Sequence, residues 1–170
     1  ASVERVQKEI SELQAQLDAA SKESQQIMSQ IYEWNGKLSE SQTVGHNFAI
    51  LRRQYQSDIR RIGFIVEGAA STSPVRKKVK CPVCGEETER TYDTTFIDAS
   101  AAELEKIKRH LSELNDAQHG VARQQEKIVA NIRALEERKG AIDALISEQL
   151  RPKLSAFEEE LEKQLKLMRL

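Results

Sequence analysis

The chain has 170 residues, of which 39% are hydrophobic, 31% are charged and only 5% are aromatic, and its formal net charge is −1. Ala, Glu, Lys, Leu and Arg make up about half of the chain, which is typical of long helices or coiled coils. The near-neutral charge argues against a dedicated nucleic-acid-binding surface, and no apolar run is long enough for a membrane span.

Residues 1–62 carry a heptad pattern that predicts one long ascending helix. Steps of alternately three and four residues, from Val3 to Ile62, meet apolar side chains at most positions. We call these the seam positions, because such a strict repeat buries one narrow face of a helix against another helix. The polar or small exceptions are Ser24, Ser41, Gly45 and Arg52.

Residues 63–99 interrupt this pattern with glycine, serine and proline, and we expect them to form a separate tip. The first helix is expected to end at the start of this stretch. The segment Phe64-Ile65-Val66 is expected to form a strand or a cap on that helix, and residues 75–80 and 87–92 to form short strands.

Residues 100–170 carry a second heptad pattern and are expected to form the descending helix. Ser100 and Glu103 fit a capping box, which predicts that this helix starts at Ser100. The heptad phase slips after Ile146, close to Pro152, which lacks a backbone donor. We therefore expect a kink or break near residues 147–152.

The two patterns have similar lengths, so folding back antiparallel buries both seams. This pairing places Val3 near Glu162 and Ile62 near Glu103, and it sets Gly45 opposite Gly120. Facing glycines suggest either a joint in the rod or two independent weak points. The predicted fold is all-α, a long antiparallel coiled-coil hairpin with a small β-knuckle at its tip, and we expect it to be a segment of a longer protein.

Both cysteines of the chain lie in the tip, in the sequence Cys81-Pro82-Val83-Cys84-Gly85. Two thiolates three positions apart can reach one tetrahedral Zn²⁺. Pro82 sets the turn, and Gly85 can adopt a left-handed conformation that lets backbone donors point at sulfur. The motif therefore predicts a zinc knuckle, and so few cysteines favour a reducing compartment.

A structural zinc site needs four ligands, and this motif supplies half of them. The only histidines are His46, His110 and His119, and all three lie in the predicted helices. We therefore expect one Zn²⁺ to be shared by two chains that meet tip to tip on a two-fold axis.

Basic residues precede the motif and favour thiolate over thiol. The alternatives are an ordinary solvated basic turn or a phosphate contact, and the acidic Glu86, Glu87 and Glu89 that follow weaken the second. The basic residues are Arg76, Lys77, Lys78 and Lys80, of which Lys78 and Lys80 are the predicted thiolate-stabilising charges.

Catalysis by this segment is not expected. The residues after Gly85 do not read as the apolar helix start of a thioredoxin-like enzyme. No Walker-type phosphate loop is present, and two paired helices offer no cleft for a catalytic set.

The CPVCG knuckle between two long heptad segments resembles the zinc hook of SMC-like ABC-type ATPases. This family includes the DNA double-strand-break repair ATPase and related ATPases of bacterial defence systems, and the long tip is nearer to the second group. The resemblance implies that Cys81 and Cys84 ligate zinc and that the tip packs against its partner through Pro82, Val83, Val79 and Gly85.

The resemblance also implies a setting for the segment. Each hairpin would join the two halves of an ATPase head at its base, DNA would be reached through the parent complex, and the protein would be cytoplasmic, with association with the nucleoid as a further expectation. The function so predicted is zinc-mediated homodimerisation and tethering for DNA repair or defence. The alternatives are a coiled-coil scaffold whose tip binds a different protein, with zinc absent or held within one chain, and a thiol–disulfide enzyme.

Overall fold

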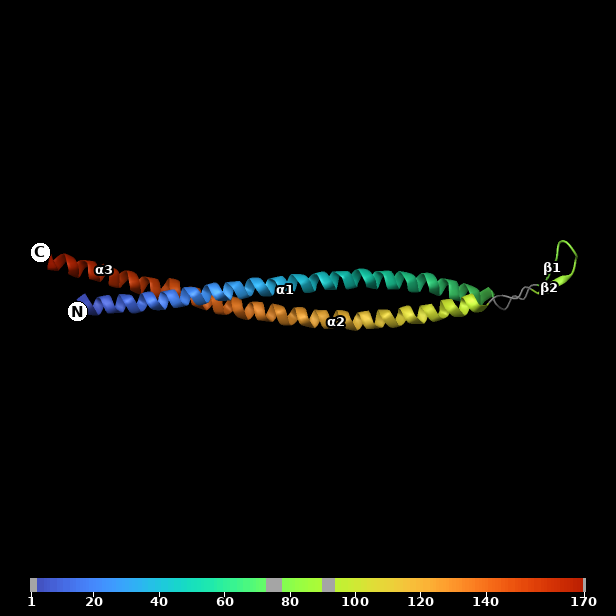
Figure 1. Ribbon diagram of the computed structural model, residues 1–170, viewed down its shortest axis with the longest axis horizontal. Helices are drawn as coiled ribbons and strands as arrows, with labels where there is room; N and C mark the ends of the chain where they lie inside the picture. The colour runs from blue at the N-terminus through green and yellow to red at the C-terminus, as the bar shows by residue number, and fades with distance from the viewer. Residues whose placement is uncertain (1–2, 73–77, 90–93, 170) are drawn as a thin grey trace. The chain divides into compact units, whose positions relative to one another are not determined.

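The computed structural model describes residues 3–72, 78–89 and 94–169, and almost all of them are helical. The long helix α1 (Val3–Thr72) is followed by two short strands, β1 (Lys78–Lys80) and β2 (Glu87–Glu89). A second long helix, α2 (Thr94–Ala144), continues as the π-helical segment η1 (Leu145–Leu150) and then as α3 (Arg151–Met168) (Figure 1). The predicted all-α architecture with two long packed helices is confirmed.

The chain divides into two compact units. One unit combines Ala1–Ser41 with Gln124–Leu170, and the other is Gln42–Arg123. The boundaries fall close in sequence to Gly45 and Gly120, for which the sequence left open a joint or two independent weak points, and α1 and α2 are helical through both glycines. Neither glycine breaks its helix, and the choice between these alternatives stays a prediction.

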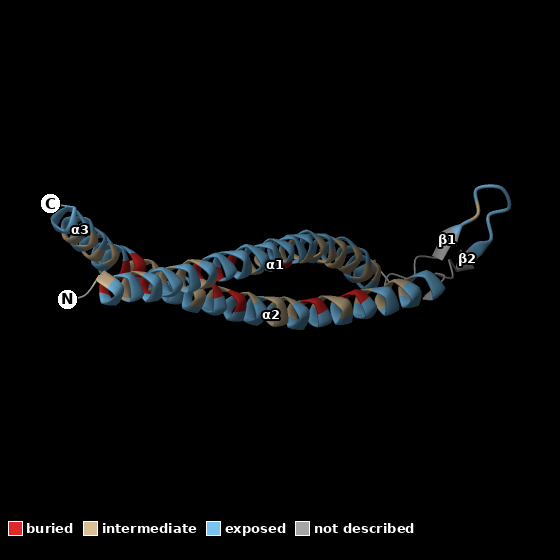
Figure 2. Cartoon of the chain, turned by 60° about the vertical axis from the view of Figure 1, so that its left-hand side comes forward, coloured by how far each residue is buried: buried red, intermediate tan, exposed pale blue. Residues whose placement is uncertain are grey.

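The seam of the first unit is buried as the heptad pattern predicts. Ile27 and Ile31 of α1 form a cluster with Ile128 and Ile132 of α2. Each of them is less than a tenth exposed, and Figure 2 colours the buried positions of α1 and α2 red. Early residues of α1 meet late residues of α2, so the two segments run antiparallel within this unit.

A second cluster joins Leu13 of α1 to Ile146 and Leu150 of η1. Pro152 lies in the first turn of α3. Because proline has no backbone N–H, one carbonyl group of the preceding turn lacks its usual hydrogen-bond donor. A π turn holds more residues than an α turn, so η1 absorbs the phase slip and keeps Ile146 and Leu150 both buried. The predicted disturbance near 147–152 is this π segment, and the helical path continues through it.

Polar contacts cross the same unit beside the seam. The hydroxyl of Ser24, a polar seam residue, donates a hydrogen bond of 2.6 Å to the Asp143 carboxylate. Arg138 pairs with Glu23 across the two helices, and within α2 Lys139 forms an ion pair with Asp143 at 2.6 Å. Ser24, a polar residue at a seam position, thus has a hydrogen-bond partner on the other helix.

In the second unit the helices extend further than predicted, and the expected end of the first helix near residue 62 is wrong. α1 continues to Thr72 because the heptad seam itself continues through the half-buried Val66 and Ala69. The segment Phe64-Ile65-Val66 is helical and not a strand. The cost of Gly63 and Gly68, up to about 1 kcal/mol each, does not end the helix.

The second long helix also starts earlier than the capping box indicated. α2 begins at Thr94, so Ser100 and Glu103 lie inside it. The half-buried Ile97 extends the seam of α2 towards its start, ahead of Ile107 and Leu114, which are buried. Among the described residues, no helix contains a stretch that is both long and apolar enough to cross a membrane.

Candidate metal centre

The two cysteines lie in a short β-hairpin that we call the knuckle (Lys78–Glu89). Its strands pair antiparallel, with Lys78 opposite Glu89 and Lys80 opposite Glu87. Both strands lie within the two segments where the sequence predicts strands. Cys81 directly follows β1, so the strand pair fixes the start of the CPVCG turn.

Two backbone hydrogen bonds close the turn. The Cys81 N–H donates to the Glu86 carbonyl at 2.8 Å, and the Gly85 N–H donates to the Cys81 carbonyl at 2.9 Å. The second bond spans four residues, as in one turn of an α-helix. Residues three apart on such a turn are neighbours, so Cys81 and Cys84 lie on the same side of it.

Gly85 has the left-handed conformation expected from the motif. Its φ of 76° is the only positive φ among the described residues. A Cβ built at Gly85 would meet no atom within 4 Å, so space does not require glycine there. The requirement is conformational, because residues other than glycine strain the backbone at a positive φ.

Both cysteines are free thiols, with Cys81 half-buried and Cys84 exposed. The pKa of Cys81 is lowered mainly by a hydrogen bond from the Cys84 backbone N–H, then by the Val83 N–H and by the Cys84 thiol; burial opposes this. Hydrogen bonds to a charged form stabilise it. The turn therefore favours the thiolate of Cys81, which is the form that binds metal.

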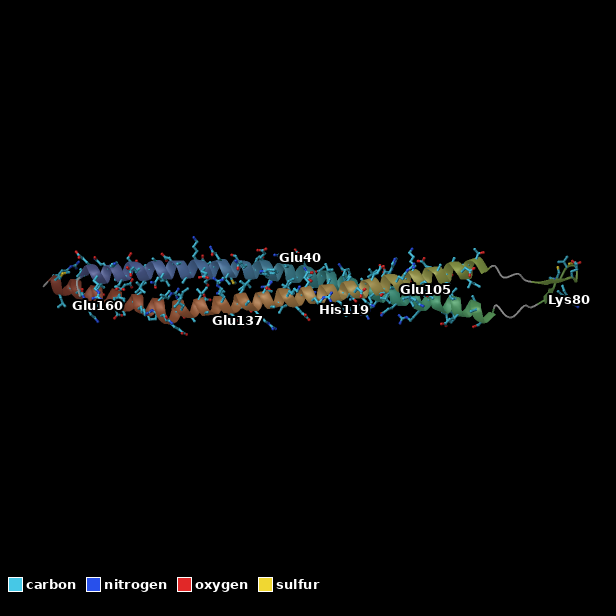
Figure 3. All side chains as sticks on the ribbon, turned by 90° about the horizontal axis from the view of Figure 1, so that it is seen from below. Glu40, Lys80, Glu105, His119, Glu137 and Glu160 are labelled. Atoms are coloured by element: carbon cyan, nitrogen blue, oxygen red, sulfur yellow. The ribbon has the colours of Figure 1, made fainter. Side chains whose placement is uncertain are left out.

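The other predicted site residues whose side chains the structure describes are all exposed. Pro82 is exposed, Val83 is 92% exposed at the end of the knuckle, and Lys80 is exposed (Figure 3). The side chains of Lys78 and Val79 lie outside the described residues, as do Arg76 and Lys77 entirely. Hydrogen bonds lower the pKa of Cys81, and thiolate stabilisation by Lys78 and Lys80 stays a prediction.

The histidines lie on the long helices of the second unit. The ring of His110 lies 6.1 Å from the ring of Tyr55, centroid to centroid, which gives this half-buried histidine a packing partner. His46 and His119 are exposed. Within the described ranges, no group of three or more His, Cys, Asp or Glu side chains is placed to hold a metal ion together.

Comparisons of the chain with protein-family models, with curated proteins and with solved structures find no match. The resemblance to zinc hooks therefore rests on the CPVCG motif and on its place between two long helices. The donor chemistry of the site fits half of a tetrahedral zinc centre, because two adjacent thiols share one turn and backbone N–H groups point at one of them.

Proposed function

We propose that this segment joins two copies of its own chain through a zinc ion shared by their knuckles. The observation that carries the proposal is the turn that sets Cys81 and Cys84 side by side, with Cys81 held towards its thiolate form by hydrogen bonds. When bound, zinc would be coordinated tetrahedrally by four thiolates. Cys81 and Cys84 of each chain would provide two of these ligands.

The count of donors supports a shared site over a site within one chain. The whole sequence contains two cysteines and three histidines, and the histidines lie in α1 and α2 and not in the knuckle. A two-fold arrangement uses the same patch on both chains and completes the set of four. Pro82 and Val83 are exposed beside the thiols, so a partner knuckle would cover an apolar side chain that is otherwise in water.

The long helices would then connect the knuckle to the rest of a parent protein. By resemblance, that parent would be an SMC-like ABC-type ATPase of DNA repair or bacterial defence, with the segment itself non-catalytic. DNA would be reached through the parent complex and not through this segment.

Sedimentation equilibrium tests the proposal directly. The chain with zinc should sediment as a dimer, and a chelator should return it to the monomer. Cys81→Ser and Cys84→Ser should each remain monomeric with zinc, whereas the control Met28→Ser, which removes an exposed sulfur from α1, should still dimerise.

A dimer that survives both the chelator and the cysteine substitutions would refute the shared site. A monomer with one tightly bound zinc ion would refute it as well, and would support the scaffold whose tip binds a different protein.

A further inference from the structure

A second heptad stripe runs along α1 on the side opposite the seam, within the second unit. It repeats in steps of alternately four and three residues, as the seam does, and all its positions are exposed. Tyr55 on the seam side contacts His110 of α2, so the opposite side of α1 faces away from α2. We call this the outer stripe, and its residues are His46, Ile50, Arg53, Ser57, Arg60 and Phe64.

The outer stripe has the composition of a protein interface. Ile50 is 50% exposed and Phe64 is 79% exposed, so two large apolar side chains are in water on one side of α1. Arg53 and Arg60 lie between them, and the stripe contains no lysine and no acidic residue. The cores of interfaces between proteins are enriched in arginine and aromatic residues and depleted in lysine, glutamate and aspartate.

The matching positions of α2 show an ordinary outer face in the same unit. They have the same spacing and are exposed, and they carry two basic and two acidic residues, so their formal charges cancel. Such alternation of sign is typical of a solvated helix face. The outer stripe of α1 therefore differs from its counterpart both in charge balance and in apolar content. The α2 positions are Glu105, Arg109, Ser112, Asp116, His119 and Arg123.

Arg53 and Arg60 lie seven residues apart, which is about 10 Å along the helix. Neither forms an ion pair with another described residue, whereas the neighbouring Arg61 pairs with Asp58 at 3.2 Å. Asp58 is the only acidic residue in the stretch 42–66. Both exposed guanidinium groups can therefore bind carboxylates of another molecule, which they hold through paired hydrogen bonds.

Spacing and charge together indicate what kind of molecule fits the outer stripe. Alternate steps of three and four residues are the spacing at which one helix packs along another, and helices dock on such faces through apolar anchors. The outer stripe of a second copy would bring arginine against arginine, which is unfavourable. The phosphate rows of a nucleic acid duplex would attract Arg53 and Arg60 but offer no apolar surface to Ile50 and Phe64.

We propose that the outer stripe of α1 binds an acidic amphipathic helix of a different protein. Apolar side chains of that helix would cover Ile50 and Phe64, and its carboxylates would pair with Arg53 and Arg60. The partner would thus lie along α1 as a third helix. The proposal does not rest on the shared zinc site, because no residue of the knuckle belongs to the stripe.

The test uses the full chain, with a chelator present, and a fluorescently labelled helical peptide of three heptads. Each heptad carries leucine and, three residues later, glutamate on the same face, and in a second peptide lysine replaces the glutamate. Fluorescence anisotropy should show saturable binding of the glutamate peptide and binding of the lysine peptide that is at least about tenfold weaker. The absence of saturable binding, or tighter binding of a DNA duplex than of the glutamate peptide, would overturn the proposal.

Substitutions locate the binding on the outer stripe. The double change Arg53→Gln and Arg60→Gln should weaken binding of the glutamate peptide about fivefold, and Phe64→Ser should weaken it about tenfold. The control Arg123→Gln removes the same charge from the outer face of α2 and should change binding by less than about twofold. Equal losses for the stripe variants and the control would contradict the assignment to α1.

An exchange of charges gives a result that loss of folding cannot imitate. The double change Arg53→Glu and Arg60→Glu should reverse the preference, so that the lysine peptide binds more tightly than the glutamate peptide. An unchanged preference would overturn the proposal. Because anisotropy reports on the stripe and sedimentation with zinc reports on the knuckle, failure of one proposal is distinguished from failure of the other.

Discussion

Replacing Ile27 by alanine tests the buried seam of the first unit. Ile27 is 4% exposed and packs in the cluster with Ile31, Ile128 and Ile132. The change removes three carbon atoms at about 0.8 kcal/mol for each buried CH₂, and incomplete collapse of the space adds to this. The higher helix propensity of alanine returns a few tenths of a kcal/mol. We expect the free energy of unfolding to fall by about 2–3 kcal/mol.

The neighbouring Met28 provides a matched control. It follows Ile27 on α1 but is 56% exposed, so Met28→Ala should change the free energy of unfolding by no more than about 0.5 kcal/mol. The free energy of unfolding of both variants is measured by urea denaturation, with the helical signal monitored by circular dichroism. A chelator is present, so metal-linked dimerisation does not contribute. Equal losses for the two variants, or a larger loss for Met28→Ala, would show that the seam of α1 is not where the structure places it.

Three further predictions concern single residues. Gly36→Ala should raise the free energy of unfolding by up to about 1 kcal/mol in the same urea experiment, because Gly36 lies inside α1 and an added Cβ meets no atom within 4 Å; a loss of stability would contradict this. Gly85→Ala should weaken zinc binding about five- to tenfold in a chelator competition, and Gly85→Asn should weaken it less, since Asn tolerates a positive φ better; equal effects would mean that backbone strain is not the cause. The hydrogen bonds from Lys139 and Ser24 lower the pKa of Asp143, so its contribution to stability is present above about pH 4 and is lost as the pH falls through the lowered pKa. Asp143→Asn should therefore make thermal unfolding less dependent on pH below about pH 4 than in the unmodified chain, and an unchanged pH profile would rule out this contribution.

The heptad pattern predicted most of the helical pairing, because burial of a narrow seam leaves a strict spacing in the sequence. The contact of Tyr55 with His110 agrees with the predicted antiparallel register, and the cluster that holds Ile27 and Ile128 agrees with the predicted antiparallel direction. The limits of the helices were predicted less well. Gly63 was read as a helix end and Ser100 as a helix start, although a continuing seam at Val66 and Ile97 outweighs both local signals.

Other features depend on contacts that spacing does not record. The pairing of Ser24 with Asp143 joins residues far apart in the sequence, and a polar seam residue alone does not name its partner. The π turn of η1 follows from the phase slip and Pro152 together, and the sequence indicated its place but not its form. For the knuckle, the framing Gly85 predicted the left-handed turn, whereas the different exposures of Cys81 and Cys84 became evident only in the structure.

Native mass spectrometry of the reduced chain with zinc tests the central claim most directly, because it reports the number of chains and the number of metal ions in one particle. The account predicts a particle of two chains with a single zinc ion, which disappears when either cysteine is replaced by serine. A single chain that carries its own zinc ion, or a pair of chains that forms without metal, would contradict it.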